Sequence, residues 1–434
     1  MSAAAGYLAE VALRARLGRV TAVSGVAIEA HGPDTTVGEI CNISVAGGLV
    51  QAEVVGIRPG RVALMPYGDV GAIHVGALVS ATGDRARVPV GSALLGRVID
   101  AFGHPLDGGP ALETVLTRAL QATPINPLSR PPIQDVMETG VRAIDLLTPL
   151  GRGQRVGVFA GSGVGKSTLL GMLARHVAAD VSVIALIGER GREVREFIER
   201  SLGEHGLRRS VVVVATSDQP ALARVRAALA ATSIAEYFRE QGAQVLLMMD
   251  SLTRFAMARR EIGLAAGEPP TARGYTPSVF SDLPVLCERC GTTANGGAIT
   301  ALYTVLVEGD DFNEPVSDIV RATLDGHIML TRDLAHQGHF PAIDVLQSAS
   351  RLASDLASGQ ERATMRAAVE VLADYERNRQ MIEMGAYKAG ANAGIDRAIA
   401  LFPALQAVLR QSVDEPSARA EAFARLRAAL GAAT

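Results

Sequence analysis

The chain has 434 residues, with 42 Lys and Arg against 45 Asp and Glu and a formal net charge of −3. This near balance argues against a general nucleic-acid binder, which would carry a basic excess to meet the phosphate backbone. Apolar residues make up 48% of the chain, which is enough for a large core and excludes a disordered or collagen-like protein.

The first 90 residues predict a small β-barrel after a short N-terminal extension. Tyr7–Leu17 has helical spacing, and we expect an extension over 1–18 that either packs on the protein or docks a partner. Short apolar runs follow, interrupted by Gly or Pro at close intervals, which is typical of a barrel and places a β-domain at 19–90. These runs are Arg19–Ile28, Leu49–Ile57 and Val62–Met65.

The rest of the chain predicts an α/β domain at 91–345 and a helical domain at 346–434. Turn-rich segments at 100–109 and 124–132 indicate a linker, after which strands alternate with helices. Such alternation favours a mostly parallel sheet with helices on both faces, here a P-loop (RecA-like) fold. The expected strands are Val156–Phe159, Val181–Ile187, Val211–Ala215, Val245–Met249 and Ile299–Val307, and helical spacing alone continues in Ser354–Leu372, Asp396–Arg410 and Ser417–Leu430.

Rare residue types narrow the search for chemistry. Only two of the 42 basic residues are Lys, namely Lys166 and Lys388, and a lysine that survives in such an Arg-rich chain has a chemical reason to be there. The three cysteines, Cys41, Cys287 and Cys290, are typical of a reducing cytosol. One CxxC pair without a second ligand pair disfavours a metal site. The first residues lack a basic segment followed by an apolar one, so we do not expect a signal peptide. The longest apolar runs are far shorter than a membrane span requires.

The sharpest motif follows the strand Val156–Phe159 and precedes a helix. It reads AGSGVGKST and matches the GxxxxGK[ST] phosphate loop except that Ala160 replaces the first Gly. The glycines allow backbone N–H groups to turn toward phosphate oxygens, the helix N-terminus adds a positive dipole end, and Lys166 supplies a compact charge for the β- and γ-phosphates. The expected nucleotide-binding residues are Gly161, Ser162, Gly163, Val164, Gly165, Lys166, Ser167 and Thr168.

Two acidic residues follow other expected strands. Asp250 ends the apolar strand Val245–Met249, about where a P-loop protein needs a carboxylate for Mg²⁺, and the hydroxyl of Ser167 is the second expected metal ligand. Glu189 follows Val181–Ile187 at the same edge of the sheet. Spacing alone leaves open whether Glu189 orients the attacking water or belongs to a solvated charge cluster that begins a helix.

Together these residues resemble the ATPases of type III protein export, flagellar or injectisome, which are related to the catalytic β subunit of the rotary ATP synthase. The similar segments include PPIQDVMETGVRAIDLLTPLGRGQRVGVFAGSGVGKST, GERGREVREFIE and FPAIDVLQSASR. The resemblance is strong over about 300 residues and looser over the N-terminal barrel. Export ATPases also carry Ala at the position of Ala160.

The resemblance implies roles at matched positions. Glu189 would polarise the attacking water, Arg190 would contact phosphate, Asp250 would hold the Mg²⁺ shell and Phe340 would stack on adenine. Arg351 would be an arginine finger that reaches the site of a neighbouring subunit, so that the active form would be a homohexamer. The implied ligands are ATP and Mg²⁺.

The resemblance also implies a place in the cell and partners. The ring would lie in the cytoplasm, peripheral to the inner membrane, and would act on the export gate and on complexes of chaperone and substrate. A stator-like regulatory protein would bind the N-terminal segment. The segments LLMMDSLTRFAMARRE and GYTPSVF favour a flagellar over an injectisome role.

Three alternatives stay open. An RNA-translocating hexameric helicase would need stacking aromatics and basic charge in its N-terminal domain, but residues 1–90 hold only Tyr7 and Tyr67 as aromatics besides lacking Lys. A catalytic subunit of a hetero-hexameric rotary synthase would copurify with a paralogous subunit. A nucleotide-sensing structural ring would show no useful turnover in a steady-state ATPase assay at concentrations that support the hexamer.

Overall fold

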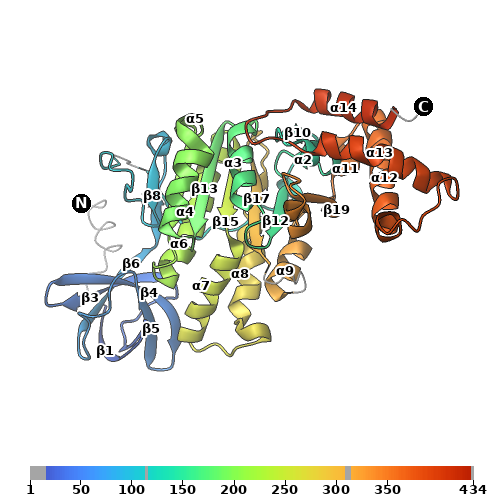
Figure 1. Ribbon diagram of the computed structural model, residues 1–434. Helices are drawn as coiled ribbons and strands as arrows, with labels where there is room; N and C mark the ends of the chain where they lie inside the picture. Colours follow the sequence, from blue (N-terminus) through green and yellow to red (C-terminus); the bar gives the residue numbers. More distant parts are fainter. Residues whose placement is uncertain (1–15, 113–115, 308–313, 432–434) are drawn as a thin grey trace.

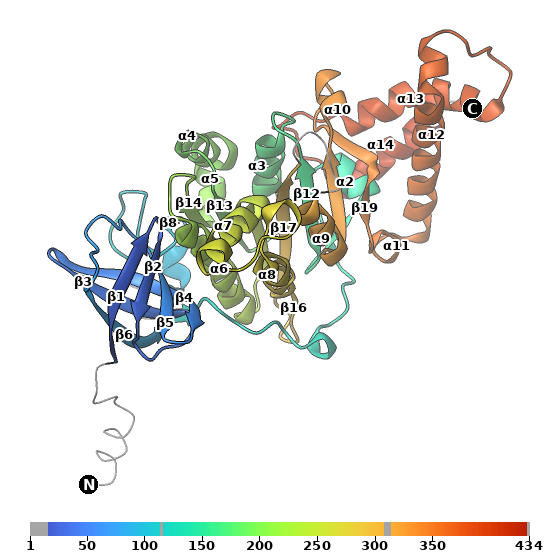
Figure 2. The ribbon, with the colours of Figure 1, turned by 90° about the horizontal axis from the view of Figure 1, so that it is seen from below.

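The computed structural model describes residues 16–431 except 113–115 and 308–313. Figures 1 and 2 show three parts in a row, with the barrel at one end, a helix-covered sheet in the centre and a group of helices at the other end. The order confirms the predicted fold class. The helix predicted over Tyr7–Leu17 lies almost wholly outside the described residues.

The N-terminal part is a closed six-stranded barrel in the order β1-β2-β5-β4-β3-β6. Pairing of Leu17 in β1 with Ser80 in β6 contributes to the closure, which leaves no free sheet edge. Ile28, Ile43 and Leu64 point inward and are fully buried. The strands are β1 Leu17–Ser24, β2 Ala27–His31, β3 Glu39–Val45, β4 Gly48–Arg58, β5 Arg61–Pro66 and β6 Leu78–Arg85.

The central sheet has nine strands, eight of them in the order β19-β18-β12-β17-β15-β13-β14-β8, with β16 paired to β17. The pairs from β18 to β8 are parallel, whereas β19 and β16 run antiparallel to their neighbours. All carboxyl ends of the parallel strands therefore meet at one edge. The strands are β8 Val98–Asp100, β12 Arg155–Ala160, β13 Val181–Ile187, β14 Ser210–Ala215, β15 Gln244–Asp250, β16 Gly291–Thr292, β17 Ala298–Leu306, β18 Gly326–Leu330 and β19 Ile343–Ser350.

Successive side chains of these strands point to opposite faces of the sheet and pack into two separate hydrophobic cores. In β13, Val183 and Ala185 pack with one set of helices, whereas Ile184 and Leu186 pack with the other set. Burial on both faces explains why the parallel strands read as continuous apolar runs. One face is covered by α6 Ala221–Glu240, α7 Leu252–Ala265 and α8 Pro277–Glu288, and the other by α2 Arg142–Leu147 and α3 Lys166–His176.

The C-terminal part is helical, with α12 and α14 packed against α13. A capping box begins α12, in which Ser358 Oγ accepts from Glu361 N at 3.3 Å and Ser358 N donates to Glu361 Oε2 at 2.7 Å. The helices are α11 Ala353–Leu356, α12 Gly359–Glu383, α13 Ala393–Leu409 and α14 Arg419–Gly431. Within the described part of the chain, no helix combines the length and the apolar character needed to cross a bilayer.

Two segments differ from the expected organisation. The turn-rich stretch at 100–109 was expected to be linker, but β8 at its start pairs with β14 and extends the central sheet. Strands were expected to stop near residue 346, yet β19 continues the sheet to Ser350. Both strands lie at the edges of the sheet. The sequence pattern is weak there because β8 has only three residues and most side chains of β19 are at least partly exposed.

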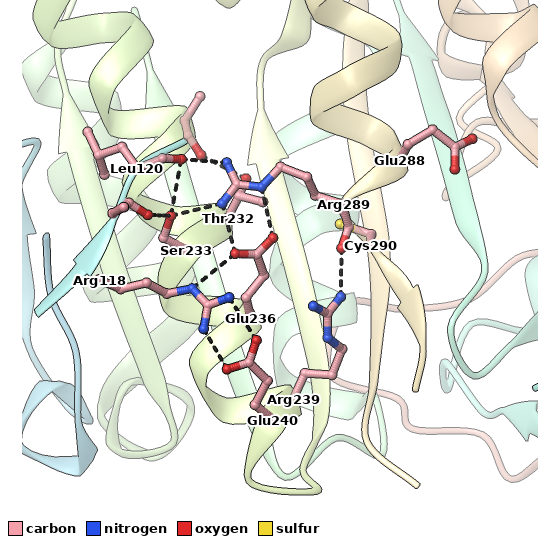
Figure 3. A network of polar contacts seen from close by, with 12 residues as sticks. Arg118, Leu120, Thr232, Ser233, Glu236, Arg239, Glu240, Glu288, Arg289 and Cys290 are labelled. Carbon is pink, nitrogen blue, oxygen red and sulfur yellow. Dashed lines mark hydrogen bonds and ion pairs between the residues drawn. The ribbon is translucent and has the colours of Figure 1, made fainter. Parts of the chain in front are cut away.

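A buried ion-pair network joins residues 118–120 to helix α6 and to the turn after α8 (Figure 3). Arg289 in the turn after α8 donates to both carboxylate oxygens of Glu236 on α6 at 2.8 Å and to the carbonyl of Leu120 at 2.7 Å. Arg118 of β9 (Thr117–Ala119) donates to Glu236 at 3.2 Å and binds Glu240. Because Arg289 and Glu236 are almost fully buried, each stabilises the other against the cost of desolvation.

Candidate nucleotide-binding site

The phosphate loop connects β12 to α3 at the carboxyl edge of the sheet. Gly163 and Gly165 have φ values of 80° and 90°, a left-handed conformation that favours glycine. No side chain caps the first turn of α3, so its N–H groups remain available for an anion. Ala160 is the fully buried last residue of β12 and pairs with Leu306 and Leu330, which is why a methyl group replaces the usual glycine without strain.

Three predicted site residues come together at this loop. Lys166 Nζ contacts Asp250 Oδ1 and lies 3.5 Å from Glu189 Oε1. The two carboxylates reach the lysine from the ends of β15 and β13, which are neighbours in the sheet. Thr304 on β17, the strand between β12 and β15, donates to Asp250 Oδ1 at 2.6 Å and fixes that carboxylate. The side chains are between 7% and 16% exposed, so water screens their charges only weakly.

This environment changes the acidity of Glu189. Burial raises the pKa of Glu189 to about 7, and the negative charge of Asp250 acts in the same direction. The positive charge of Lys166 opposes both effects. A carboxyl group that titrates near neutral pH beside a phosphate loop is suited to proton chemistry on a bound water.

The oxygen donors at this edge fit a magnesium ion. Ser167 is exposed at the start of α3, directly after Lys166. The carboxylate of Asp250 ends β15 at the same sheet edge and contacts Lys166. Magnesium typically binds one or two protein oxygens and fills its remaining positions with water and phosphate. The described residues contain no group of three or more His, Cys, Asp or Glu side chains that could hold a metal ion.

Phe340 forms one wall of a pocket beside the phosphate loop. Its ring is 47% exposed, and a Cβ added at Gly165 would lie 3.8 Å from its Cδ1 atom. The pocket, of about 690 Å³, is lined on its other sides by the first turns of α3 and by residues 410–415, the loop between α13 and α14. An exposed aromatic ring next to a phosphate site is the arrangement that stacking on a purine base requires.

The other two predicted residues lie away from this cluster. Arg190 follows Glu189 directly, but its side chain is 80% exposed and pairs with Glu193 at 3.5 Å. Arg351 follows β19, whose pairing of Ser350 with Gly326 lies at the amino end of β18. The phosphate loop leaves β12 beside Leu330, at the carboxyl end of β18, so Arg351 and the phosphate loop of the same chain lie at opposite edges of the sheet.

Two features of the site were missed in the sequence. One is Arg254 on α7, which packs so closely on Gly188 that a Cβ at that glycine would lie 2.9 Å from the Arg254 Cβ. Its buried Nε has no hydrogen-bond partner among the described residues, and the side chain packs on Gly188, which precedes Glu189 in the chain. The other is the loop at 410–415, about 245 residues after the phosphate loop and without a recognisable motif. Its only sequence signals are the turn-forming Ser412 and Asp414 and the proline that follows at 416.

Comparison with known proteins agrees with this geometry. Residues 140–350 match the nucleotide-binding domain of the ATP synthase alpha/beta family, and residues 20–83 match the beta-barrel domain of that family. Residues 357–428 match the T3SS EscN ATPase C-terminal domain.

Full-length relatives are also similar. The flagellum-specific ATP synthase of Bacillus subtilis is 53% identical over 419 residues, which cover 96% of this chain and 95% of that protein. The type 3 secretion system ATPase of Sinorhizobium fredii is 48% identical over 402 residues, covering 92% and 89%. The assembled ATPase EscN of the enteropathogenic E. coli type III secretion system superposes with a TM-score of 0.91 at 44% identity, covering 95% of this chain and all of EscN. Another EscN structure, in complex with its central stalk EscO, has a TM-score of 0.87 at 43% identity and the same coverage.

Proposed function

This chain belongs to the ATP synthase alpha/beta family and is an ATP-binding ATPase of its type III protein export branch, and from that premise we propose that it works as a homohexameric ring that energises flagellar protein export. The observation that carries the proposal is the separation of the site across the sheet. Lys166, Glu189 and Asp250 gather at one edge, whereas Arg351 stands at the other. A site that needs this arginine is complete only when a second subunit supplies it.

Each residue has a task in hydrolysis. The N–H groups of residues 161–168 hold the phosphates, and Lys166 balances charge on the β- and γ-phosphates. Glu189, in its carboxylate form, accepts hydrogen bonds from the attacking water and orients it toward the γ-phosphorus. Arg254, which packs on Gly188, would offer a second cationic donor. Arg190 would become a further phosphate contact after a rotation of its exposed side chain. Phe340 stacks on the adenine ring.

A magnesium ion and the arginine finger complete the proposed mechanism of hydrolysis. Ser167 and Asp250 would hold Mg²⁺, which when bound neutralises negative charge on the phosphate oxygens. Arg351 of a neighbouring subunit would stabilise the charge on the γ-phosphoryl group, a contribution worth about 10³–10⁵ in rate in comparable enzymes. We therefore expect isolated subunits to bind ATP but to turn it over slowly.

Coupling to export follows from the chain's position in this branch. The ring would lie in the cytoplasm at the inner-membrane export apparatus and convert turnover into movement at the export gate and on chaperone–substrate complexes. A stalk-like partner would occupy the ring axis, as a central stalk does in the EscN complex, and a stator-like protein would bind the N-terminal segment. We also propose domain limits near residues 18, 90 and 345, which truncation experiments can test.

The test has a biochemical and a cellular arm. Specific ATPase activity should rise with protein concentration in step with hexamer formation measured by light scattering. Deletion of the gene should abolish motility and secretion of flagellar subunits, and a plasmid copy should restore both. Normal flagella in the deletion strain would favour the second candidate, an injectisome ATPase, which the similarity to the Sinorhizobium protein and to EscN supports.

A further inference from the structure

The loop at 410–415 forms a second wall of the pocket that Phe340 lines. It makes hydrogen bonds to three segments of the nucleotide-binding domain. Residues 410–415 connect α13 to α14 and line the pocket together with Val164, Thr168 and Phe340. The loop belongs to the C-terminal helices and has no regular structure of its own. Its position against the phosphate loop therefore depends on contacts made across the boundary between the two parts.

Gln411 is the central contact. Its backbone N–H donates to the carbonyl of Phe340 at 2.9 Å, which ties the two walls of the pocket together. Its side-chain Oε1 accepts from the N–H of Arg142 at 2.8 Å, and its Nε2 donates to the carbonyls of Gly140 at 2.7 Å and Glu415 at 2.5 Å. Gln411 is only 5% exposed, so these buried groups have no alternative partner in water.

Arg142 holds the same loop from the start of α2. Its guanidinium donates to the carbonyl of Val408 at 2.7 Å, to the carbonyl of Arg410, and to the carboxylate of Glu415 at 2.5 Å. Arg142 is 4% exposed. One planar cation thus contacts the loop near its beginning and at its end, a task for which the rigid fork of arginine is suited and a lysine is not.

The phosphate loop takes no part in these contacts. Among the described residues, none of the hydrogen bonds made by the side chains of Gln411 and Arg142 reaches residues 161–168. The third contact comes from Arg175 at the far end of α3, which donates to the carbonyl of Val413 at 3.2 Å. The two ends of a bound nucleotide are therefore held by separate sets of residues.

We propose that Gln411 and Arg142 are positioning residues for the nucleotide base, and that they hold the loop at 410–415 so that base and Phe340 stack in a pocket of fixed width. The inference deepens the proposed function and rests on it. Affinity for the base then depends on both side chains, whereas affinity for the phosphates does not. Because the loop joins α13 to α14, a shift of these helices and the strength of base binding are linked in both directions.

The experiment compares a ligand that has a base with one that has none. Binding of ADP and of inorganic tripolyphosphate is measured by calorimetry on the purified full chain with Mg²⁺ present, for wild type and for Gln411→Met. Methionine keeps the length of the side chain but removes all three of its hydrogen bonds. We expect Kd for ADP to rise about tenfold, the scale of one or two lost buried hydrogen bonds, with Kd for tripolyphosphate changed less than twofold.

Two further variants keep the result interpretable if Gln411→Met folds poorly. Arg142→Lys retains a charge against Glu415 but loses the fork, and should weaken ADP about threefold in the same base-selective manner. Gln360→Met, at an exposed position near the start of α12, is the matched control and should change neither ligand. In the double variant Phe340→Ala/Gln411→Met, the loss should be smaller than the product of the single losses, because both residues act on the same base.

The possible results separate the inference from the proposed function. Equal weakening of ADP and tripolyphosphate by both variants would mean a general structural role and would overturn the inference while leaving the ATPase assignment intact. Unchanged ADP binding in Gln411→Met would overturn it as well. A wild-type protein that binds neither ligand would refute the proposed function and the inference together.

Discussion

The ammonium nitrogen of Lys166 lies 3.5 Å from Oε1 of Glu189, and the same nitrogen contacts Asp250. One cation thus stands between two carboxylates that come from different strands. The phosphate loop, the expected metal ligand and the expected water-orienting group are therefore one electrostatic unit. A change in one of the three charges alters the state of the other two.

Replacement of Lys166 by Arg should abolish turnover although the charge is kept. The loop around Lys166 is closed by glycine backbone with positive φ, and a planar guanidinium would not fit between Glu189 and Asp250 as a compact ammonium does. We expect kcat to fall by roughly 10² or more. Lys388→Arg is the matched control, because Lys388 is exposed between α12 and α13, and its ATPase rate should equal that of wild type.

Activity should depend on pH through Glu189. The group acts as a carboxylate, and because its pKa is raised to about 7, it becomes protonated as the pH falls below 7. The value of kcat/KM should therefore decrease about tenfold per pH unit below 7 and level off above it, since this quantity reports the free enzyme. A flat profile between pH 5.5 and 8 would contradict the role of Glu189.

Glu189→Gln should separate binding from hydrolysis. The amide keeps the size of the side chain but cannot act as a base, so we expect a loss of about 10²–10⁴ in kcat. Nucleotide binding should persist or strengthen, because one negative charge near the phosphates is removed. Single-turnover measurements with calorimetry on the same sample provide both values, and wild-type turnover in this variant would refute the mechanism.

Arg351 should act in trans. Arg351→Ala and Lys166→Ala rings should each lose activity, the first by about 10³ or more. When the two proteins are mixed and allowed to exchange subunits, some interfaces combine an intact phosphate loop from one chain with an intact Arg351 from the other. Partial recovery of activity, rising to a maximum near equal amounts, supports a shared site, whereas no recovery in verified mixed rings would argue against it.

The buried pair of Glu236 and Arg289 should contribute to stability rather than to catalysis. Glu236→Ala leaves the guanidinium of Arg289 buried, and the partners that remain for it in the described part of the chain are the carbonyl of Leu120 and the hydroxyl of Ser233. Breaking a buried pair in this way costs about 3–5 kcal/mol. Denaturant unfolding should show this loss, and the double variant Glu236→Leu/Arg289→Leu should recover part of it, because no charge is then left unpaired.

The sequence by itself determined the features that contiguous residues encode. The phosphate loop was recognisable because its glycines, lysine and serine follow one another, and the central strands were recognisable as continuous apolar runs. Glu189 and Asp250 were expected at one edge because the carboxyl ends of parallel strands meet there. The family resemblance then suggested Phe340 and Arg351, which no local pattern marked.

Only the tertiary structure decided which of these residues meet. Strand β17 separates β12 from β15 in the sheet, and it is this order that brings Asp250 to Lys166 across 84 positions of sequence. The loop at 410–415 and Arg254 join the site through packing between distant elements. Of the two edge strands, β8 is only three residues long and most side chains of β19 are at least partly exposed, so neither forms a long apolar run. Strand order and contacts between elements follow from the packing of the whole chain, so the local periodicity of the sequence does not predict them.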